Sequence, residues 1–141
     1  MTKTSEVFLD TAFAIALVVP RDALHAVAVS VADRLRVERT RMVTTWAVIL
    51  EIGNALSRAR YRSVAVSLLD SIAENRDLEI VPFSERLVEE SLALFRVRDD
   101  KEWSLTDCMS FVVMRQRGIT DASTADDHFR QAGFRPLLTS G

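Results

Sequence analysis

Short segments rich in apolar and β-branched residues alternate along the chain with longer segments whose apolar residues recur at helical spacing. Five short segments have the composition of buried strands, over residues 7–9, 42–45, 78–83, 119–122 and 134–138. Six longer segments have helical periodicity, over residues 22–39, 46–60, 63–74, 84–98, 104–117 and 126–131. Strands that alternate with helices predict an α/β fold in which helices cover both faces of a parallel sheet.

No repeat or linker interrupts this alternation, so the pattern predicts a single domain over residues 1–141. The apolar run at 12–19 is far shorter than the ~20 residues that a membrane span needs. Glu6 and Asp10, just before that run, are atypical of a signal peptide. We therefore expect a soluble, cytoplasmic protein that does not enter the membrane.

Composition and charge exclude several classes of protein. The chain is 48% apolar with only four glycines and three prolines, which is typical of a globular domain and not of a disordered one. Its single cysteine excludes an internal disulfide and a cysteine-based zinc site. A net charge of −2 argues against a protein that coats nucleic acid through bulk charge, although it leaves a local nucleic-acid site open.

Four acidic residues occupy apolar or structured settings. Asp10 ends the first predicted strand, and Asp126 follows the fourth. Glu51 and Asp107 lie inside apolar helices, and Glu51 is expected to point with the apolar face of its helix. Carboxylates that converge without matching cations repel one another, and a hard divalent cation with oxygen ligands relieves that repulsion. The four acids are therefore candidate metal ligands.

Local structure offers a second explanation for most of these acids. Asp107 fits the third helical position of a capping box that begins at Ser104, and Asp127 fits the same position after Thr124. Asp10 alone could be a turn residue that follows a strand. Glu51 is the hardest to explain in this way, because no lysine or arginine lies three or four residues from it.

Four segments make the chain resemble a PIN domain, and within that group a VapC-type toxin of a type II toxin–antitoxin pair. They are VFLDTAFAIAL, TTWAVILEIGNAL, SLTDCMSFVVMRQRGI and TADDHFRQAGFRPL, which together span most of the chain. The resemblance implies a three-layer α/β/α fold around a central parallel sheet of four to five short strands. It also implies that the acids at the matching positions are catalytic and bind metal: Asp10, Glu51, Asp107 and Asp126.

Two further residues near the last of these acids enter through the resemblance. The family has a small hydroxyl residue there, which in this chain is Thr124. Asp127 stands where relatives often have a basic or neutral residue, so either Asp126 or Asp127 could face the metal. Neighbouring helical residues point about 100° apart, so both are not expected to face it. We favour Asp126 from its place after Thr124 and Ala125.

The activity that the resemblance implies is hydrolysis of RNA by an endoribonuclease that depends on Mg²⁺ or Mn²⁺. A toxin of this kind is held inactive by a cognate antitoxin protein, and a homodimer is expected. Two other functions stay open at this point. One is a catalytically inactive PIN-like module that binds RNA or protein, and the other is an RNA-processing nuclease that is not a toxin.

Other polar and aromatic residues have structural explanations first. Arg58 and Arg62 belong to a solvated helix face, or else they contact RNA phosphates or an antitoxin. His128, beside the last predicted acid, is interpreted first as a surface or packing residue, with contact to the substrate as the alternative. Trp46 and Trp103 are expected to be core or interface aromatics, and Cys108 a buried thiol without a catalytic role.

Overall fold

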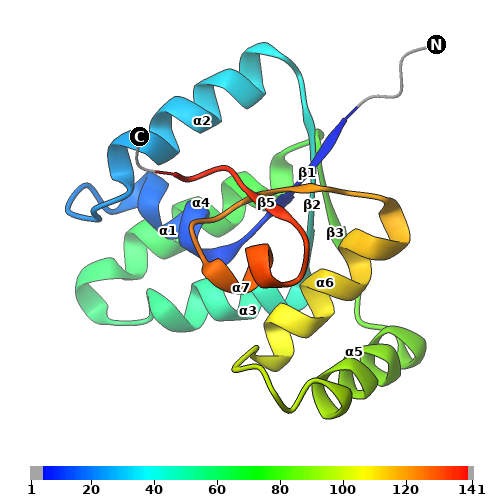
Figure 1. The fold of residues 1–141 in the computed structure, drawn as a ribbon. Helices are drawn as coiled ribbons and strands as arrows, with labels where there is room; N and C mark the ends of the chain where they lie inside the picture. Colours follow the sequence, from blue (N-terminus) through cyan, green and yellow to red (C-terminus); the bar gives the residue numbers. More distant parts are fainter. Residues whose placement is uncertain (1–4, 140–141) are drawn as a thin grey trace.

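Five parallel strands form the centre of the molecule (Figure 1). The structure is a computed structural model, and it describes residues 5–139. The strands are β1 (Glu6–Leu9), β2 (Arg41–Thr45), β3 (Leu78–Val81), β4 (Asp121–Ser123) and β5 (Arg135–Pro136). They lie in the order β3-β2-β1-β4-β5, so the first and fourth strands of the chain are neighbours.

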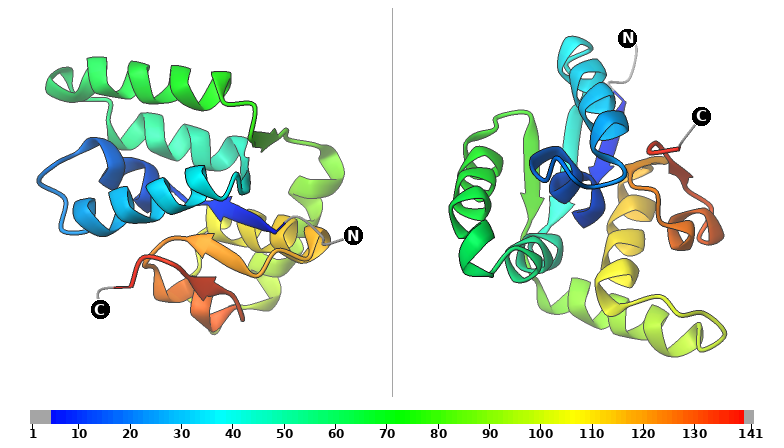
Figure 2. Two further views of the ribbon diagram at one scale, coloured as in Figure 1. Left: turned by 90° about the horizontal axis from the view of Figure 1, so that it is seen from above. Right: turned by 90° about the vertical axis from the view of Figure 1, so that its left-hand side faces the viewer.

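Helices cover both faces of this sheet (Figure 2). One face carries α1 (Thr11–Val18), α2 (His25–Val37), α3 (Trp46–Ala55) and α4 (Arg62–Glu74), with a short 3-10 turn η1 (Ala59–Tyr61) before α4. The other face carries α5 (Glu85–Val97), α6 (Leu105–Arg117) and α7 (Asp127–Gln131). Right-handed crossovers produce this division, because the connections from β1 to β3 run along the sheet in one direction and those from β3 to β5 run back. The three-layer α/β/α fold predicted from the sequence is confirmed.

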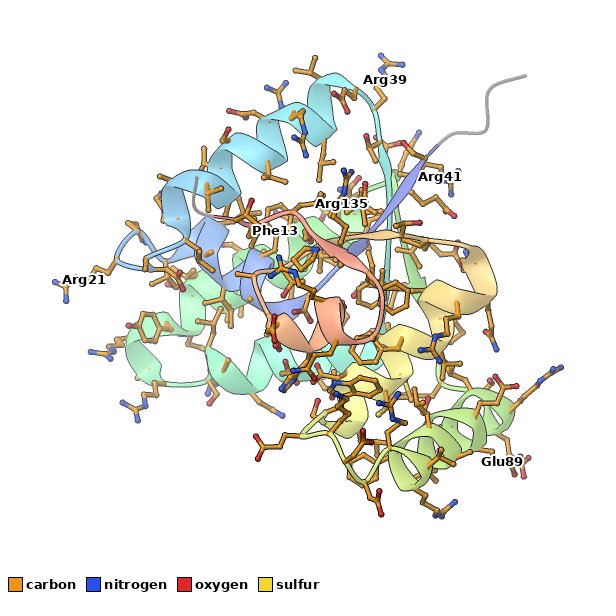
Figure 3. The ribbon with its side chains drawn as sticks, viewed as in Figure 1. Phe13, Arg21, Arg39, Arg41, Glu89 and Arg135 are labelled. Atoms are coloured by element: carbon orange, nitrogen blue, oxygen red, sulfur yellow. The ribbon has the colours of Figure 1, made fainter. Side chains whose placement is uncertain are left out.

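Aromatic side chains join α6 and α7 to the sheet. The Phe111 ring meets the Phe129 ring edge-on with centroids 5.0 Å apart, and the Trp103 ring in the same way at 4.9 Å. Phe8 of β1 lies 6.3 Å from Phe129. Phe13 of α1 is buried in the interior on the opposite face (Figure 3). This packing fixes the position of the short helix α7, which has too few residues to be stable alone.

The apolar run at 12–19, which the sequence pattern did not assign, is the helix α1. Its positions are buried or half-buried all round, so it lacks the amphipathic spacing by which a surface helix is recognised. The next helix begins at His25 and not at Asp22, because the Asp22 carboxylate accepts a hydrogen bond from the Leu24 N–H (2.8 Å) within the preceding turn. Within residues 5–139, no helix combines the length and the apolar character needed to cross a bilayer.

Several predicted boundaries differ from the structure at the ends of elements. The helix predicted over 46–60 ends at Ala55, shortly after Gly53 and Asn54, which are poor helix formers. The strand predicted over 119–122 lies at Asp121–Ser123. The last strand, predicted over 134–138, is only Arg135–Pro136, because a proline has no N–H to donate and the strand lies at the sheet edge.

The strand order creates one point at which ligands collect. The connections that leave β1 and β4 run to opposite faces of the sheet, although the two strands are adjacent. A crevice forms at the carboxyl ends of two such strands, and ligands of open α/β sheets bind there. Asp10 follows β1 directly, and Thr124 follows β4 directly. The expected single domain over residues 1–141 remains a prediction, and its outermost residues, 1–4 and 140–141, lie outside the described part of the chain.

Candidate metal centre

Asp10 is a buried carboxyl group at the carboxyl end of β1. Its residue is 6% exposed, and its Oδ2 accepts a hydrogen bond from the Thr124 hydroxyl at 2.8 Å. Burial raises the pKa of Asp10 to about 7, against the hydrogen bonds from Thr124 and from the Thr11 N–H, which lower it. The negative charges of Asp107 and Glu51 raise the Asp10 pKa further. The charges of Glu51 and Asp107 therefore act on Asp10, and Thr124 holds Asp10 in place.

Thr124 links the ends of β1 and β4. Its buried hydroxyl donates to Asp10 and accepts a hydrogen bond from the Asp126 N–H at 3.1 Å. The capping box predicted from Thr124 to Asp127 is wrong, because Asp126 itself is the N-cap of α7 and accepts from the His128 N–H at 2.9 Å. The Thr124 side chain is instead engaged with the Asp10 carboxyl, a contact across 114 positions of the chain.

Asp107 caps its helix, as one of the two interpretations of the sequence expected, and its carboxylate also lies beside two other candidate metal ligands. It is the third residue of α6 and completes a capping box with Ser104: its Oδ2 accepts the Ser104 N–H at 3.1 Å, and its own N–H donates to the Ser104 hydroxyl at 3.0 Å. The same Oδ2 also lies 2.9 Å from Nδ1 of His128. Asp107 can do both because one carboxylate oxygen accepts more than one hydrogen bond: Oδ2 accepts from the Ser104 N–H and also lies beside the His128 imidazole.

Asp126, and not Asp127, faces the other acids. One ligand atom from each of Asp107, Asp126 and His128 lies within 4.8 Å of the other two. Asp127 is exposed and contacts residues of its own helix, the Arg130 guanidinium at 3.7 Å and the Gln131 amide at 3.2 Å. Asp126 is the N-cap of α7 with an extended backbone, and Asp127 is the first residue of the helix, so their side chains take different directions and only Asp126 meets Asp107 and His128.

His128 is a member of this cluster that the sequence interpretation missed. Its Nδ1 lies 2.9 Å from the Asp107 carboxylate and 3.5 Å from Oδ1 of Asp126. Burial opposes the charged imidazole, but the hydrogen bond to Asp107 and the charges of Asp126, Asp107 and Glu102 together raise the pKa of His128. The only local signal was its position two residues after Asp126, and partnership with Asp107 could not be read from that spacing.

Glu51 belongs to α3, in the helical layer opposite α6 and α7, and its negative charge raises the pKa of Asp10. The expectation that it shares the apolar face of α3 is wrong: the residue is exposed, because the buried stripe of α3 consists of Val48, Ile49 and Ile52. Glu51 precedes Ile52 and so lies about 100° from it around the helix. Its charge acts on Asp10, although within residues 5–139 its carboxylate forms no hydrogen bond or ion pair.

The residues of this site fit a divalent cation. None of the four carboxylates forms an ion pair with a lysine or arginine in the part of the chain that the structure describes. Among the described residues, the charges of Asp107 and Asp126 are paired only with His128. Carboxylate oxygens are the ligands of Mg²⁺ and Mn²⁺, and an imidazole nitrogen adds affinity for transition metals.

The remaining candidate residues lie elsewhere or serve the fold. Arg58 and Arg62 are exposed, and the Arg62 guanidinium donates to the Ser57 carbonyl at 2.6 Å, with no contact to the acids. Trp103 is buried, as expected, and donates its indole N–H to Gln131 at 3.0 Å. Trp46 is 42% exposed, so it is not a core residue of this chain.

Comparison with known proteins agrees with this geometry. The PIN domain family matches residues 7–135, which include all four acids. The chain belongs to the PIN domain family. The resemblance inferred from the four sequence segments is confirmed. The catalytic and metal-binding roles that it implies for the four acids remain a prediction.

Individual PIN-domain proteins are also similar over nearly the whole chain. The 23S rRNA-specific endonuclease VapC20 from two strains of Mycobacterium tuberculosis is 31% identical over 129 residues, 91% of this chain and 95% of the relative. The crystal structure of that protein, described as a sarcin–ricin loop cleaving toxin, superposes with a TM-score of 0.79 and 29% identity, over 91% of this chain and 95% of the other. A VapC-type toxin is therefore the kind of PIN-domain protein that this chain resembles.

Two more distant structures share the fold. VapBC2 from Rickettsia felis, bound to a DNA fragment from its promoter, has a TM-score of 0.67 at 14% identity, over 93% and 96% of the two chains. FitAcB from Neisseria gonorrhoeae has a TM-score of 0.66 at 17% identity, over 92% and 95%. At these identities the comparison supports the three-layer fold alone.

Proposed function

We propose that this PIN-domain protein is an endoribonuclease toxin that requires Mg²⁺ or Mn²⁺. The observation that carries the proposal is the cluster of Asp107, Asp126 and His128, together with buried Asp10, whose pKa the charges of Asp107 and Glu51 raise. Within residues 5–139, none of these carboxylates forms an ion pair with a lysine or arginine. A 31% identical relative named as a 23S rRNA-specific endonuclease supports RNA as the substrate and makes ribosomal RNA the first to test.

The chain's own residues would prepare this site for hydrolysis of a phosphodiester bond. Asp10, Glu51, Asp107 and Asp126 would hold the cation, with Glu51 contributed by α3. A bound divalent ion supplies an activated water and neutralises charge that develops on the phosphate. Thr124 keeps the Asp10 carboxyl aimed at the site, since its hydroxyl donates to Oδ2. Burial raises the pKa of Asp10 to about 7, so a cation held by this carboxyl would displace any proton that it carries.

Adjacent aspartates provide a matched test of the site. Asp126→Asn and Asp127→Asn remove the same charge one residue apart, and asparagine is also a good N-cap, so α7 should form in both variants. We expect Asp126→Asn to abolish metal-stimulated cleavage of ribosomal RNA and growth inhibition on expression, and Asp127→Asn to retain both. Equal cleavage by the two variants, after purification from a host that lacks contaminating ribonuclease, would contradict the assignment.

The same experiment separates the two other candidate functions. An inactive RNA-binding or protein-binding module would show tight RNA binding and no cleavage by the parent chain at any Mg²⁺ or Mn²⁺ concentration. A non-toxin RNA-processing nuclease would cleave RNA in a metal-dependent way without arresting growth. All four acids that the family uses are present in this chain, which favours the active nuclease.

Two exposed arginines are proposed to contact RNA phosphates near this site. Arg58 and Arg62 flank η1, which follows the helix that carries Glu51. Replacing both with alanine should weaken RNA binding and lower its dependence on salt, because fewer counterions are released. The control is Arg41, an exposed arginine at the start of β2 (Figure 3). It lies at the amino ends of the parallel strands, whereas the acidic site lies at their carboxyl ends. Equal losses in Arg41→Ala would indicate binding through overall charge.

A homodimer is proposed from exposed apolar side chains beside the crevice. Trp46 and Leu50 lie one turn apart on α3 and are 42% and 55% exposed. Phe83, 49% exposed, follows the end of β3, whose last residue pairs with the residue just before α3. A second copy would cover this patch. Leu50→Lys should shift the mass measured by light scattering from dimer to monomer, whereas Val66→Lys, at an equally exposed site on α4, should not.

A cognate antitoxin is the other proposed partner, and the cytoplasm is the proposed compartment. The 29% identical crystal structure is described as a toxin, and a toxin with an intact site needs an inhibitor for its host to grow. Co-expression of a short neighbouring reading frame should restore growth, and the product of that frame should co-purify with this protein. Growth arrest that no neighbouring gene relieves would contradict this part of the proposal.

A further inference from the structure

The position of His128 is set by the packing of its helix against the rest of the protein. Its helix is anchored by Phe129, which is fully buried against Phe111 of α6 at 5.0 Å. Its backbone N–H is bonded to the Asp126 carboxylate at 2.9 Å, which fixes the first turn of the helix. The imidazole is thereby directed at the N-terminus of α6, where its Nδ1 meets Oδ2 of Asp107 at 2.9 Å.

Two of the separations between donor atoms of this cluster lie in the range found between ligands around one ion. An octahedral cation with bonds near 2.1 Å separates neighbouring ligand atoms by about 3.0 Å and opposite ones by about 4.2 Å. His128 Nδ1 lies 2.9 Å from Asp107 Oδ2 and 3.5 Å from Asp126 Oδ1. One ligand atom from each of these three residues lies within 4.8 Å of the others. Small rotations of side chains that are 14–39% exposed would bring all three onto one cation.

We propose that His128 is a direct ligand of the metal centre, together with Asp107 and Asp126, and that its nitrogen makes the centre prefer Mn²⁺ to Mg²⁺. This inference rests on the proposed metal-dependent function and adds to it the choice of metal. Mg²⁺ favours oxygen ligands, whereas imidazole suits transition metals, and Mn²⁺ is the one that also accepts carboxylates and water readily. A site of carboxylates alone would lack this discrimination.

The competing explanation is that His128 only donates a hydrogen bond to Asp107 and never touches the metal. His128→Gln distinguishes the two, because the glutamine amide can donate to the Asp107 carboxylate but has no imidazole nitrogen. His25, the other histidine of the chain, provides a matched control, since its Nδ1 contacts the Ala16 carbonyl at 2.7 Å in the join between α1 and α2.

The experiment is spectroscopic and does not depend on nuclease activity. One equivalent of Mn²⁺ is added to the full-length protein. Electron spin-echo envelope modulation spectroscopy then detects whether a ¹⁴N nucleus of an imidazole is bound to the ion. We expect strong imidazole modulation in the parent and in His25→Gln, and its loss in His128→Gln. By calorimetry, His128→Gln should lower Mn²⁺ affinity more than Mg²⁺ affinity, whereas loss of a hydrogen bond to Asp107 alone would lower both affinities by a similar factor.

Each outcome decides the inference separately from the proposed function. Stoichiometric Mn²⁺ binding without imidazole modulation in the parent would overturn the role of His128 and leave the carboxylate site intact. So would a His128→Gln variant with unchanged preference between the two metals. Absence of any stoichiometric Mn²⁺ binding would overturn this inference and, if Asp126→Asn also cleaved RNA normally, the metal-dependent nuclease as well.

Discussion

Asp10→Asn should stabilise the metal-free protein at alkaline pH. The Asp10 carboxyl has an ordinary pKa of 3.8, and burial raises this pKa to about 7 in the folded protein. Between these values the folded state holds a proton that the unfolded state has lost, so stability falls as pH rises through this window. Above both values the ionised group costs about 4 kcal/mol at roughly 1.4 kcal/mol per pH unit. Asparagine removes this cost and keeps an oxygen that can accept from Thr124.

The measurement is urea unfolding of both proteins in a chelator, at pH 5 and at pH 8. Asp10→Asn should raise the free energy of unfolding by about 2 kcal/mol at pH 5 and about 4 kcal/mol at pH 8, the latter corresponding to roughly 10 °C in melting temperature. Asp127→Asn, at an exposed position, should change neither value. Excess Mn²⁺ should stabilise the parent more than Asp10→Asn, because it binds the ionised carboxylate. A gain no larger at pH 8 than at pH 5 would refute the reasoning from burial.

Two further substitutions test the packing that supports the site. Phe129→Ala should lower the free energy of unfolding by about 3–5 kcal/mol, because the fully buried ring meets Phe111 and Phe8; a urea midpoint near that of the parent would mean that α7 is not anchored by this ring. Gly118→Ala should cost about 1 kcal/mol in the same assay, since the residue ends α6 at φ +65° although no atom lies within 4 Å of an added Cβ. An unchanged midpoint would show that this turn relaxes without strain.

Short-range signals in the sequence located much of the candidate site. Asp10 and Asp126 could be placed because a polar residue after a buried apolar segment marks the carboxyl end of a strand. The capping box of Ser104 and Asp107 was readable from a spacing of three, and the structure contains both of its hydrogen bonds. Each of these signals involves residues within one turn or one strand of each other.

Contacts between distant segments were out of reach of such signals. The spacing of apolar residues around Glu51 did not decide whether its side chain points toward the core, because a shift of one residue turns a helix by about 100°. In the structure, the buried residues of α3 leave Glu51 exposed. His128 was assigned to the surface because its partner, Asp107, belongs to another helix. The helix α1 went unassigned because a helix buried on most sides has no polar face to reveal its period.

By itself, the sequence determined the alternation of strands and helices and the PIN-domain family, and it singled out four acids as candidate metal ligands. The tertiary structure decided which of these residues meet. The Thr124 hydroxyl reaches Asp10 because β4 lies beside β1, and Asp126 rather than Asp127 faces Asp107 because buried Phe129 sets the rotation of α7. Local patterns report which face of an element is apolar, whereas the neighbours of that face depend on strand order and packing across the whole chain.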